Sequence, residues 1–181
     1  MWQLNLNLMG VIRMTKAVLP YMRNQRDGRI INISSVGGLV GQPFNEIYCA
    51  TKFGVEGYTE AMASYVQPEF NIKFTLIEPG GIQSEFTNNV MAQLQSTGGL
   101  KDDEYKPVLD SYLGGLKENY GTGSSQTSEE VATVILNTLE MEEPPIRTRT
   151  SDWSEAFTEL KTQADPTGKE QQRRVVKLLG K

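Results

Sequence analysis

Two short apolar runs with a long helical pattern between them restrict the fold of this chain more than any other feature. The runs cover residues 29–33 and 72–77, contain several β-branched residues, and are bounded by turn-forming residues, as buried strands are. Between them, residues 45–66 place apolar side chains at near-helical intervals. Because such a helix returns the chain to the same end of a sheet, the pattern predicts two parallel strands joined by a crossover helix.

Neighbouring segments extend this unit into a larger domain. Residues 3–22 carry a second amphipathic pattern, and Thr127 with Glu130 three positions later forms the capping box of a third helix, which ends before Pro144. We therefore expect an α/β fold: a three-layer Rossmann-like parallel sheet with helices on both faces. Residues 1–181 are expected to form a single partial domain of this kind.

Two segments have less regular patterns. Residues 87–125 are polar and contain several glycines, with helical spacing only in fragments near residues 105–116. We expect this segment to be a flexible flap over the substrate site. Residues 146–181 are expected to hold a short strand and a polar helical tail.

Charge and residue counts exclude several functions. With 18 basic and 22 acidic side chains the formal net charge is −4, so the chain lacks the positive charge with which proteins bind nucleic acid. It contains no histidine, which excludes serine-protease triads and zinc sites, and we expect no metal in the site. The one cysteine, Cys49, cannot form an internal disulfide, and no apolar run reaches the ~20 residues of a membrane span. These counts favour a soluble cytoplasmic protein.

Tyr48 and Lys52 are the pair on which the predicted chemistry depends. Because they stand four positions apart on a predicted helix, their side chains lie on one face, with β-carbons about 5–6 Å apart. An ammonium group so close would favour the phenolate and lower the pKa of Tyr48, which would suit an acid/base catalyst. A tyrosine packed on the lysine stem is the alternative, and the spacing by itself favours that structural interpretation.

Other polar residues change this balance, because the predicted topology brings them to the same edge of the sheet. Ser35 follows the first strand directly, where parallel sheets place their ligands. Its hydroxyl could donate a hydrogen bond to a developing alkoxide. Asn7 lies in the preceding helix, and the segment from Pro79 to Ser84 closes the second strand.

On these residues the chain resembles the C-terminal part of the short-chain dehydrogenase/reductase family. The resemblance rests on Asn7, on NISSVGGLVGQPFNEIYCATKFGVEG at residues 32–57, and on PGGIQS at residues 79–84. It implies that Tyr48 is the general acid in carbonyl reduction and the base in alcohol oxidation. It also implies that Lys52 holds the nicotinamide ribose hydroxyls and depresses the pKa of Tyr48.

The same resemblance implies the reaction and two further catalytic roles. The reaction would interconvert a carbonyl and a secondary alcohol by hydride transfer, with NAD or NADP as cofactor. Ser35 would hydrogen-bond the substrate oxygen. Asn7 would anchor a water molecule that links Lys52 to solvent.

The segment after the second strand would contact the cofactor. In the family this segment touches the nicotinamide carboxamide, which implies roles for Pro79, Gly80, the backbone of Ile82 and the hydroxyl of Ser84. The family usually has threonine at the position of Ser84, so this residue is a mild departure from the pattern.

The front of the family pattern is missing from the sequence. No TGxxxGxG or GxGxxG motif occurs, and the chain opens inside the helix that follows the fourth strand of the family fold. We therefore expect an N-terminally truncated fold. The remaining residues distinguish neither NAD from NADP nor one carbonyl substrate from another.

Two functions remain open. The first is the NAD(P)(H)-dependent oxidoreductase acting on a small-molecule carbonyl or alcohol; the second is a truncated, non-catalytic fragment that retains only the helical subunit-interaction surface. The resemblance implies a homodimer or homotetramer formed through residues 3–22 and 45–66. Met62 and Met91 could equally line an apolar substrate pocket or fill gaps in the core.

Overall fold

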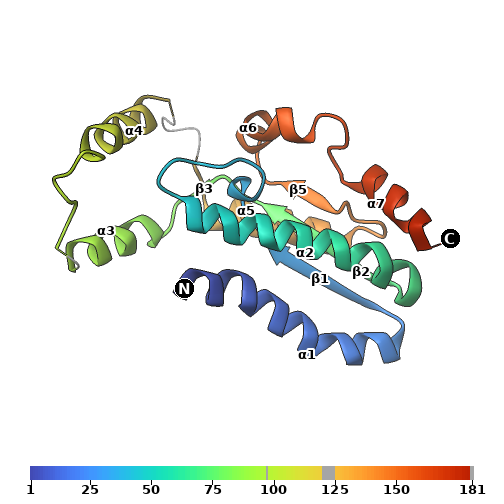
Figure 1. Cartoon of the computed structure of the whole chain (residues 1–181). Coiled ribbons are helices and arrows are strands. Elements are labelled where there is room, and N and C mark those ends of the chain that lie inside the picture. Colours follow the sequence, from blue (N-terminus) through green and yellow to red (C-terminus); the bar gives the residue numbers. More distant parts are fainter. Residues whose placement is uncertain (97, 120–124, 180–181) are drawn as a thin grey trace.

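Figure 1 shows the computed structural model of the chain, which describes residues 1–96, 98–119 and 125–179. A parallel sheet lies at its centre, with the strand order β1-β2-β5. These strands are β1 (Gly28–Ile33), β2 (Ile72–Glu78) and β5 (Arg147–Arg149). Gly28 lies opposite Ile72, and Leu76 lies opposite Arg147. Both strands expected from the apolar runs are confirmed, and the expected short strand of the tail is β5.

A second, smaller sheet follows the end of β2. It consists of β3 (Gly81–Ile82) and β4 (Ser125–Gln126), which pair in parallel. The backbone N–H of Gln83 continues this pairing by donating to the carbonyl of Gln126 at 2.8 Å. Two residues are too few to give an alternating pattern, so neither strand was expected from the sequence.

Helices make up most of the remaining chain. A π-helical turn, η1 (Leu4–Met9), leads into α1 (Gly10–Gln25), and a 3-10 turn, η2 (Val36–Gly38), follows β1. The other helices are α2 (Glu46–Phe70), α3 (Phe86–Ser96), α4 (Lys106–Asn119), α5 (Ser128–Glu140), α6 (Asp152–Thr162), α7 (Lys169–Val176) and the short 3-10 turn η3 (Lys177–Leu179). Among the residues that the structure describes, no helix combines the length and apolar character needed to cross a membrane.

The two faces of the central sheet are covered by different helices (Figure 1). On one face, strand residues such as Phe74 and Leu76 pack against α2 and α1 to form the hydrophobic core, which includes Val55 and Met62. On the other face, Thr138 of α5 lies beside Thr75 of β2. The expected three-layer arrangement with helices on both faces is therefore confirmed, and Met62 belongs to the core.

The long helix α2 extends further than the sequence indicated. Pro68 was expected to separate this helix from the next strand, yet α2 continues through it to Phe70. The last turn is stabilised because Val66 is buried and Phe70 packs against the core. The helix ends where Asn71 adopts a left-handed conformation (φ 56°), which asparagine tolerates better than most residues.

The segment expected to be a flap is largely helical. It contains α3 and α4, which project beyond the carboxyl end of the sheet, beside the first turns of α2 (Figure 1). One contact joins α4 to the loop before α2: the centres of the Tyr112 and Phe44 rings lie 5.7 Å apart. The helices are longer than the fragments of helical spacing indicated, and the role of this segment as a flexible flap stays a prediction. The side chain of Met91 lies outside the described residues.

The third predicted helix, α5, begins directly after Thr127, and the predicted capping box is present. The Thr127 hydroxyl accepts a hydrogen bond from the N–H of Glu130 at 3.1 Å, and the Glu130 carboxylate accepts one from the N–H of Thr127 at 2.7 Å. This confirms the predicted start of α5, which ends at Glu140, before Pro144.

Candidate active site

A pocket at the carboxyl ends of β1 and β2 collects almost all of the predicted site residues. Its volume is about 280 Å³, and its lining consists of Asn7, Ile33, Ser34, Ser35, Tyr48, Lys52, Pro79, Gly80 and Ile82. These residues come from the π-helical turn, β1 and its following loop, α2, and the segment after β2. Ser84 is the one predicted site residue that is not part of the lining, and it is exposed.

The loop after β1 holds Ser35 in an extended conformation. The Ser35 Oγ caps the 3-10 turn by accepting a hydrogen bond from the N–H of Gly37 at 3.0 Å, and it donates to the carbonyl of Pro79 at 3.4 Å. The N–H of Val36 donates to the same carbonyl at 3.0 Å. Ser35 is thereby fixed to the segment that follows β2, and its hydroxyl is also within hydrogen-bonding reach of the Tyr48 phenol.

Tyr48 lies in the first turn of α2 and is half-buried. Its pKa is raised above the ordinary value, because burial of the phenol outweighs the hydrogen bond from Ser35, which lowers it. The Lys52 Nζ lies 5.7 Å from the centre of the Tyr48 ring and donates a hydrogen bond to the carbonyl of Ile33 at 2.9 Å. Burial also lowers the pKa of Lys52.

The direction of the Tyr48 shift differs from the sequence expectation. We expected the ammonium group of Lys52 to lower the pKa of Tyr48, but the ammonium is bound to a backbone carbonyl beside the ring, and burial dominates. At neutral pH the phenol therefore keeps its proton. A protonated phenol suits a general acid.

Asn7 enters the pocket from the π-helical turn η1. Such turns are rare and frequently occur at functional sites, since the extra residue redirects side chains. The Asn7 amide donates to the hydroxyl of Thr51 at 3.4 Å, one residue before Lys52 on α2. The hydroxyl of Thr51 in turn donates to the carbonyl of Tyr48 at 2.7 Å. These bonds join the amide of Asn7 to the turn that carries both Tyr48 and Lys52.

The pocket wall formed by Pro79 and Gly80 depends on the absence of a side chain. A Cβ at Gly80 would lie 2.8 Å from the ring of Trp153 on α6, so only glycine lets the backbone approach this ring so closely. Ile82 follows in β3, where its pairing with Gln126 fixes the backbone. The backbone on this side of the pocket is therefore rigidly placed.

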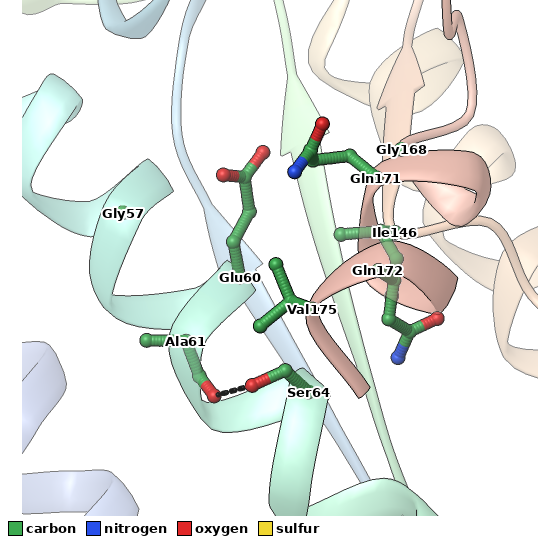
Figure 2. A pocket seen from close by; sticks show the side chains of 9 residues that line it. All are labelled: Gly57, Glu60, Ala61, Ser64, Ile146, Gly168, Gln171, Gln172 and Val175. Atoms are coloured by element: carbon green, nitrogen blue, oxygen red, sulfur yellow. Dashed lines mark hydrogen bonds between the residues drawn. The ribbon is translucent and has the colours of Figure 1, made fainter. Parts of the chain in front are cut away.

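Figure 2 shows a second cavity, of about 310 Å³, between α2 and α7. Its lining includes Glu60, Ser64 and Gln172, and it shares no residue with the pocket around Tyr48. Two of its polar side chains are engaged within the protein: Glu60 accepts a hydrogen bond from Arg147 at 2.7 Å, and Ser64 donates to the carbonyl of Ala61 at 2.7 Å. The predicted chemistry therefore belongs to the first pocket.

The geometry of the first pocket suits proton transfer to a polar oxygen. A protonated phenol and a serine hydroxyl lie within hydrogen-bonding reach of each other. An oxygen atom that reaches both groups could accept a hydrogen bond from the phenol, and one from Ser35 once that hydroxyl turns away from the Pro79 carbonyl, to which its bond is long at 3.4 Å. Lys52 uses one of its three donors on Ile33, which leaves two for another ligand.

Two buried carboxyl groups beside this pocket were missed by the sequence reasoning. Glu56 lies one turn after Lys52 on α2 and is 6% exposed, and Glu78 at the end of β2 is fully buried. The spacing of Glu56 from Lys52 indicates a surface ion pair on a helix, and that pattern concealed its burial.

Comparisons with known proteins agree with this geometry. Residues 3–95 match the model of the family described as short chain dehydrogenase. Over 152 residues, the chain is 40% identical to 3-ketodihydrosphingosine reductase of Bacteroides thetaiotaomicron, covering 81% of this chain and 52% of that protein. It is 37% identical over 164 residues to retinol dehydrogenase 8 of Bos taurus, covering 90% of this chain and 52% of the relative.

Solved structures show the same fold. A short-chain dehydrogenase from Streptomyces avermitilis superposes with a TM-score of 0.66 at 22% identity, covering 96% of this chain and 60% of that one. An actinorhodin polyketide ketoreductase with NADPH gives a TM-score of 0.53 at 27% identity, covering 72% and 48%. The chain spans about half the length of the curated relatives it matches. From the matched family model, the fold and the pocket together, we conclude that the chain belongs to the short-chain dehydrogenase family.

Proposed function

We propose that the chain is the catalytic and substrate-binding part of an NAD(P)(H)-dependent oxidoreductase that interconverts a carbonyl and a secondary alcohol. The observation that carries this proposal is the gathering of Tyr48, Ser35 and Lys52 around one pocket at the carboxyl edge of the sheet. Family membership supports it, because the relatives include proteins named as a reductase and dehydrogenases.

In this proposal Tyr48 transfers the proton. During reduction the Tyr48 phenol gives its proton to the substrate oxygen as that oxygen gains negative charge, and during oxidation the phenolate takes the proton back. Ser35 donates a hydrogen bond to the same oxygen and stabilises the developing charge. Asn7, whose amide is bound to Thr51, anchors the water molecule that we expect to link Lys52 to solvent, so that Tyr48 can regain its proton.

The pocket residues fit the nicotinamide end of a cofactor. Lys52 has donors left for ribose hydroxyls, and the backbone around Ile82 is held rigid by its strand pairing. Ser84 would add its hydroxyl from the rim, together with the backbone of Pro79 and Gly80. When bound, the nicotinamide supplies or accepts the hydride. These residues concern the nicotinamide end alone, so they suit NAD and NADP equally.

A lipophilic substrate is the class we favour. The relatives are named for 3-ketodihydrosphingosine and retinol, which are largely apolar molecules. On this chain, Phe44 lies in the loop just before α2 and is 38% exposed. Its ring contacts the ring of Tyr112 on α4, so aromatic side chains lie close to the start of the helix that carries Tyr48. A long-chain ketone should therefore be reduced faster than a short polar ketone of equal reactivity.

Cofactor titration tests the enzymatic function. NADPH and NADH fluorescence should change on addition of the 181-residue chain, and reduction of a long-chain ketone should be lost in Tyr48→Phe while cofactor binding is kept. Tyr21→Phe, at an exposed position on α1, is the matched control and should leave turnover unchanged. Full turnover by Tyr48→Phe would contradict the role of the phenol.

The second candidate function is a non-catalytic fragment that binds another subunit. It is favoured by exposed apolar side chains on the two predicted interface helices, among them Leu6, Met14 and Phe53. No change in cofactor fluorescence at millimolar concentration would support it.

We propose that either form assembles as a homodimer or homotetramer through residues 3–22, which cover η1 and most of α1, and residues 45–66, which lie mainly in α2. Light scattering should then show an oligomer that Leu6→Glu converts to monomer. A cytoplasmic location also stays a proposal, resting on the single cysteine, and fractionation of tagged cells would test it.

A further inference from the structure

The two buried glutamates beside the pocket lie in contact with each other and with the loop that carries Ser35. Glu56 comes from α2 and Glu78 from the last position of β2, directly before Pro79. A Cβ at Gly38 would lie 2.9 Å from Glu56 Oε1 and 2.7 Å from the Ser34 hydroxyl, so both groups reach the same point under the 3-10 turn. The glutamate pair therefore joins the elements that form the site.

As two carboxylates, these groups would leave too many polar atoms without partners. If both groups are ionised and can only accept, three of their buried oxygens have no hydrogen-bond donor among the described residues. These oxygens are Glu56 Oε1, Glu56 Oε2 and Glu78 Oε1. The two carboxyl groups nevertheless face each other within hydrogen-bonding reach. Since a carboxylate cannot donate, one proton between them turns this repulsive contact into a hydrogen bond.

The surrounding charges determine where that proton resides. Arg149 of β5, whose side chain is 3% exposed, donates to Glu78 Oε2 at 3.3 Å and to Glu155 of α6 at 2.9 Å. This pairing favours the ionised form of Glu78, although burial still raises the pKa of Glu78 above its usual value. Arg147 of β5 adds positive charge near Glu78. Among the described residues, Glu56 interacts with Lys52, Glu60, Glu78 and the Ser34 hydroxyl but with no arginine, so it is the member that carries the proton.

We propose that Glu56 and Glu78 share one proton and that this pair, held by Arg149, positions the Ser35 loop and leaves Lys52 free to act at the Tyr48 site. Glu56 is thus a positioning residue. An ionised Glu56 at four residues from Lys52 would attract the ammonium group into an ion pair. With Glu56 neutral, Lys52 turns to the carbonyl of Ile33, beside the Tyr48 ring. The functional part of this inference rests on the proposed function, while the shared proton does not.

Side-chain NMR of the protein labelled with ¹³C-glutamate tests the shared proton directly. One carboxyl carbon should keep the chemical shift of a protonated acid through neutral pH, and Glu56→Gln should remove that signal. Glu140→Gln, at an exposed position in the last turn of α5, is the matched control and should retain it. If every glutamate of the wild type is ionised at pH 7, the inference is wrong.

The titration of Lys52 tests the positioning role. Glu56 ionises only as pH rises through about 9, and the ionised form raises the pKa of Lys52. The Lys52 signal should therefore be the same in the wild type and Glu56→Gln at pH 7, and at higher pH the lysine should keep its proton longer in the wild type. The lysine Cε signal, assigned with Lys52→Met, reports the difference. Glutamine can donate to Glu78 as the protonated acid does, so Glu56→Gln should keep the wild-type near-ultraviolet spectrum at neutral pH. A Lys52 signal that already differs between the wild type and Glu56→Gln at pH 7 would overturn the role assigned to Glu56, because it would mean that Glu56 is ionised there.

These measurements do not depend on turnover. A chain without turnover that shows the protonated carboxyl would count against the proposed function and support the glutamate pair. Turnover by a chain in which every glutamate is ionised would support the proposed function and count against the glutamate pair.

Discussion

Replacing Glu56 with glutamine should remove most of the loss of stability that the protein suffers as pH rises. Burial, with Glu78 close by, raises the pKa of Glu56 from 4.5 to about 9 in the folded state. Between these values the folded chain holds a proton that the unfolded chain has released. The stabilising effect of that proton is therefore complete below pH 4.5 and is lost as pH rises through about 9.

The size of the effect follows from the width of this window. One proton held by the folded state alone makes the free energy of unfolding fall by about 1.4 kcal/mol for each pH unit. From pH 6 to pH 8, the wild type should lose about 3 kcal/mol on account of Glu56, and Glu56→Gln should not show this loss. Glu78, which is also buried, has a raised pKa as well, because burial outweighs its ion pair with Arg149. Part of the slope therefore remains in Glu56→Gln, and the difference between the two proteins measures the part due to Glu56.

Urea unfolding followed by far-ultraviolet circular dichroism at the two pH values measures this difference. The midpoint urea concentration of the wild type should fall markedly from pH 6 to pH 8, and that of Glu56→Gln should fall less. Glu140→Gln should follow the wild type, since its carboxyl group is exposed. Equal pH dependence in the wild type and Glu56→Gln would refute the assignment of a neutral, buried carboxyl to this position.

Three further substitutions test the fold around the site. Phe74→Ala removes a fully buried core side chain and should lower the free energy of unfolding by about 3–5 kcal/mol in urea titrations; a loss under 1 kcal/mol would contradict its place in the core. Thr127→Ala removes the hydroxyl that accepts from the Glu130 N–H and should destabilise α5 by about 1 kcal/mol, seen as faster amide exchange in its first turn. Gly80→Ala places a methyl group 2.8 Å from Trp153 and should cost about 1–3 kcal/mol and change tryptophan fluorescence; an unchanged spectrum would argue against this contact.

Several local elements could be predicted because their signals are short-range. The β-branched run that became β2 and the capping box of Thr127 and Glu130 each depend on residues a few positions apart. The pocket residues were equally accessible, since Ser35 and Pro79 directly follow strands, and parallel strands end at one edge. Ser84 shows the limit of this reasoning, because Ile82, two positions before it, lines the pocket and Ser84 does not.

The errors occurred where packing outweighs local preference. Pro68 is a helix breaker by itself, but contacts of Phe70 with the core keep α2 helical beyond it. The helices α3 and α4 were underestimated for another reason, because the glycines at residues 98–99 and 114–115 suggested a loop.

The sequence by itself determined the strand–helix–strand unit, the family and the identity of the pocket residues, because these depend on spacing along the chain. The tertiary structure alone decided the electrostatics of the site. Whether Tyr48 is more or less acidic than a free phenol, and whether Glu56 is a surface ion-pair partner or a neutral buried acid, depends on how much water the packed elements exclude. Exclusion of water is a property of the assembled fold, and no local pattern of residues records it.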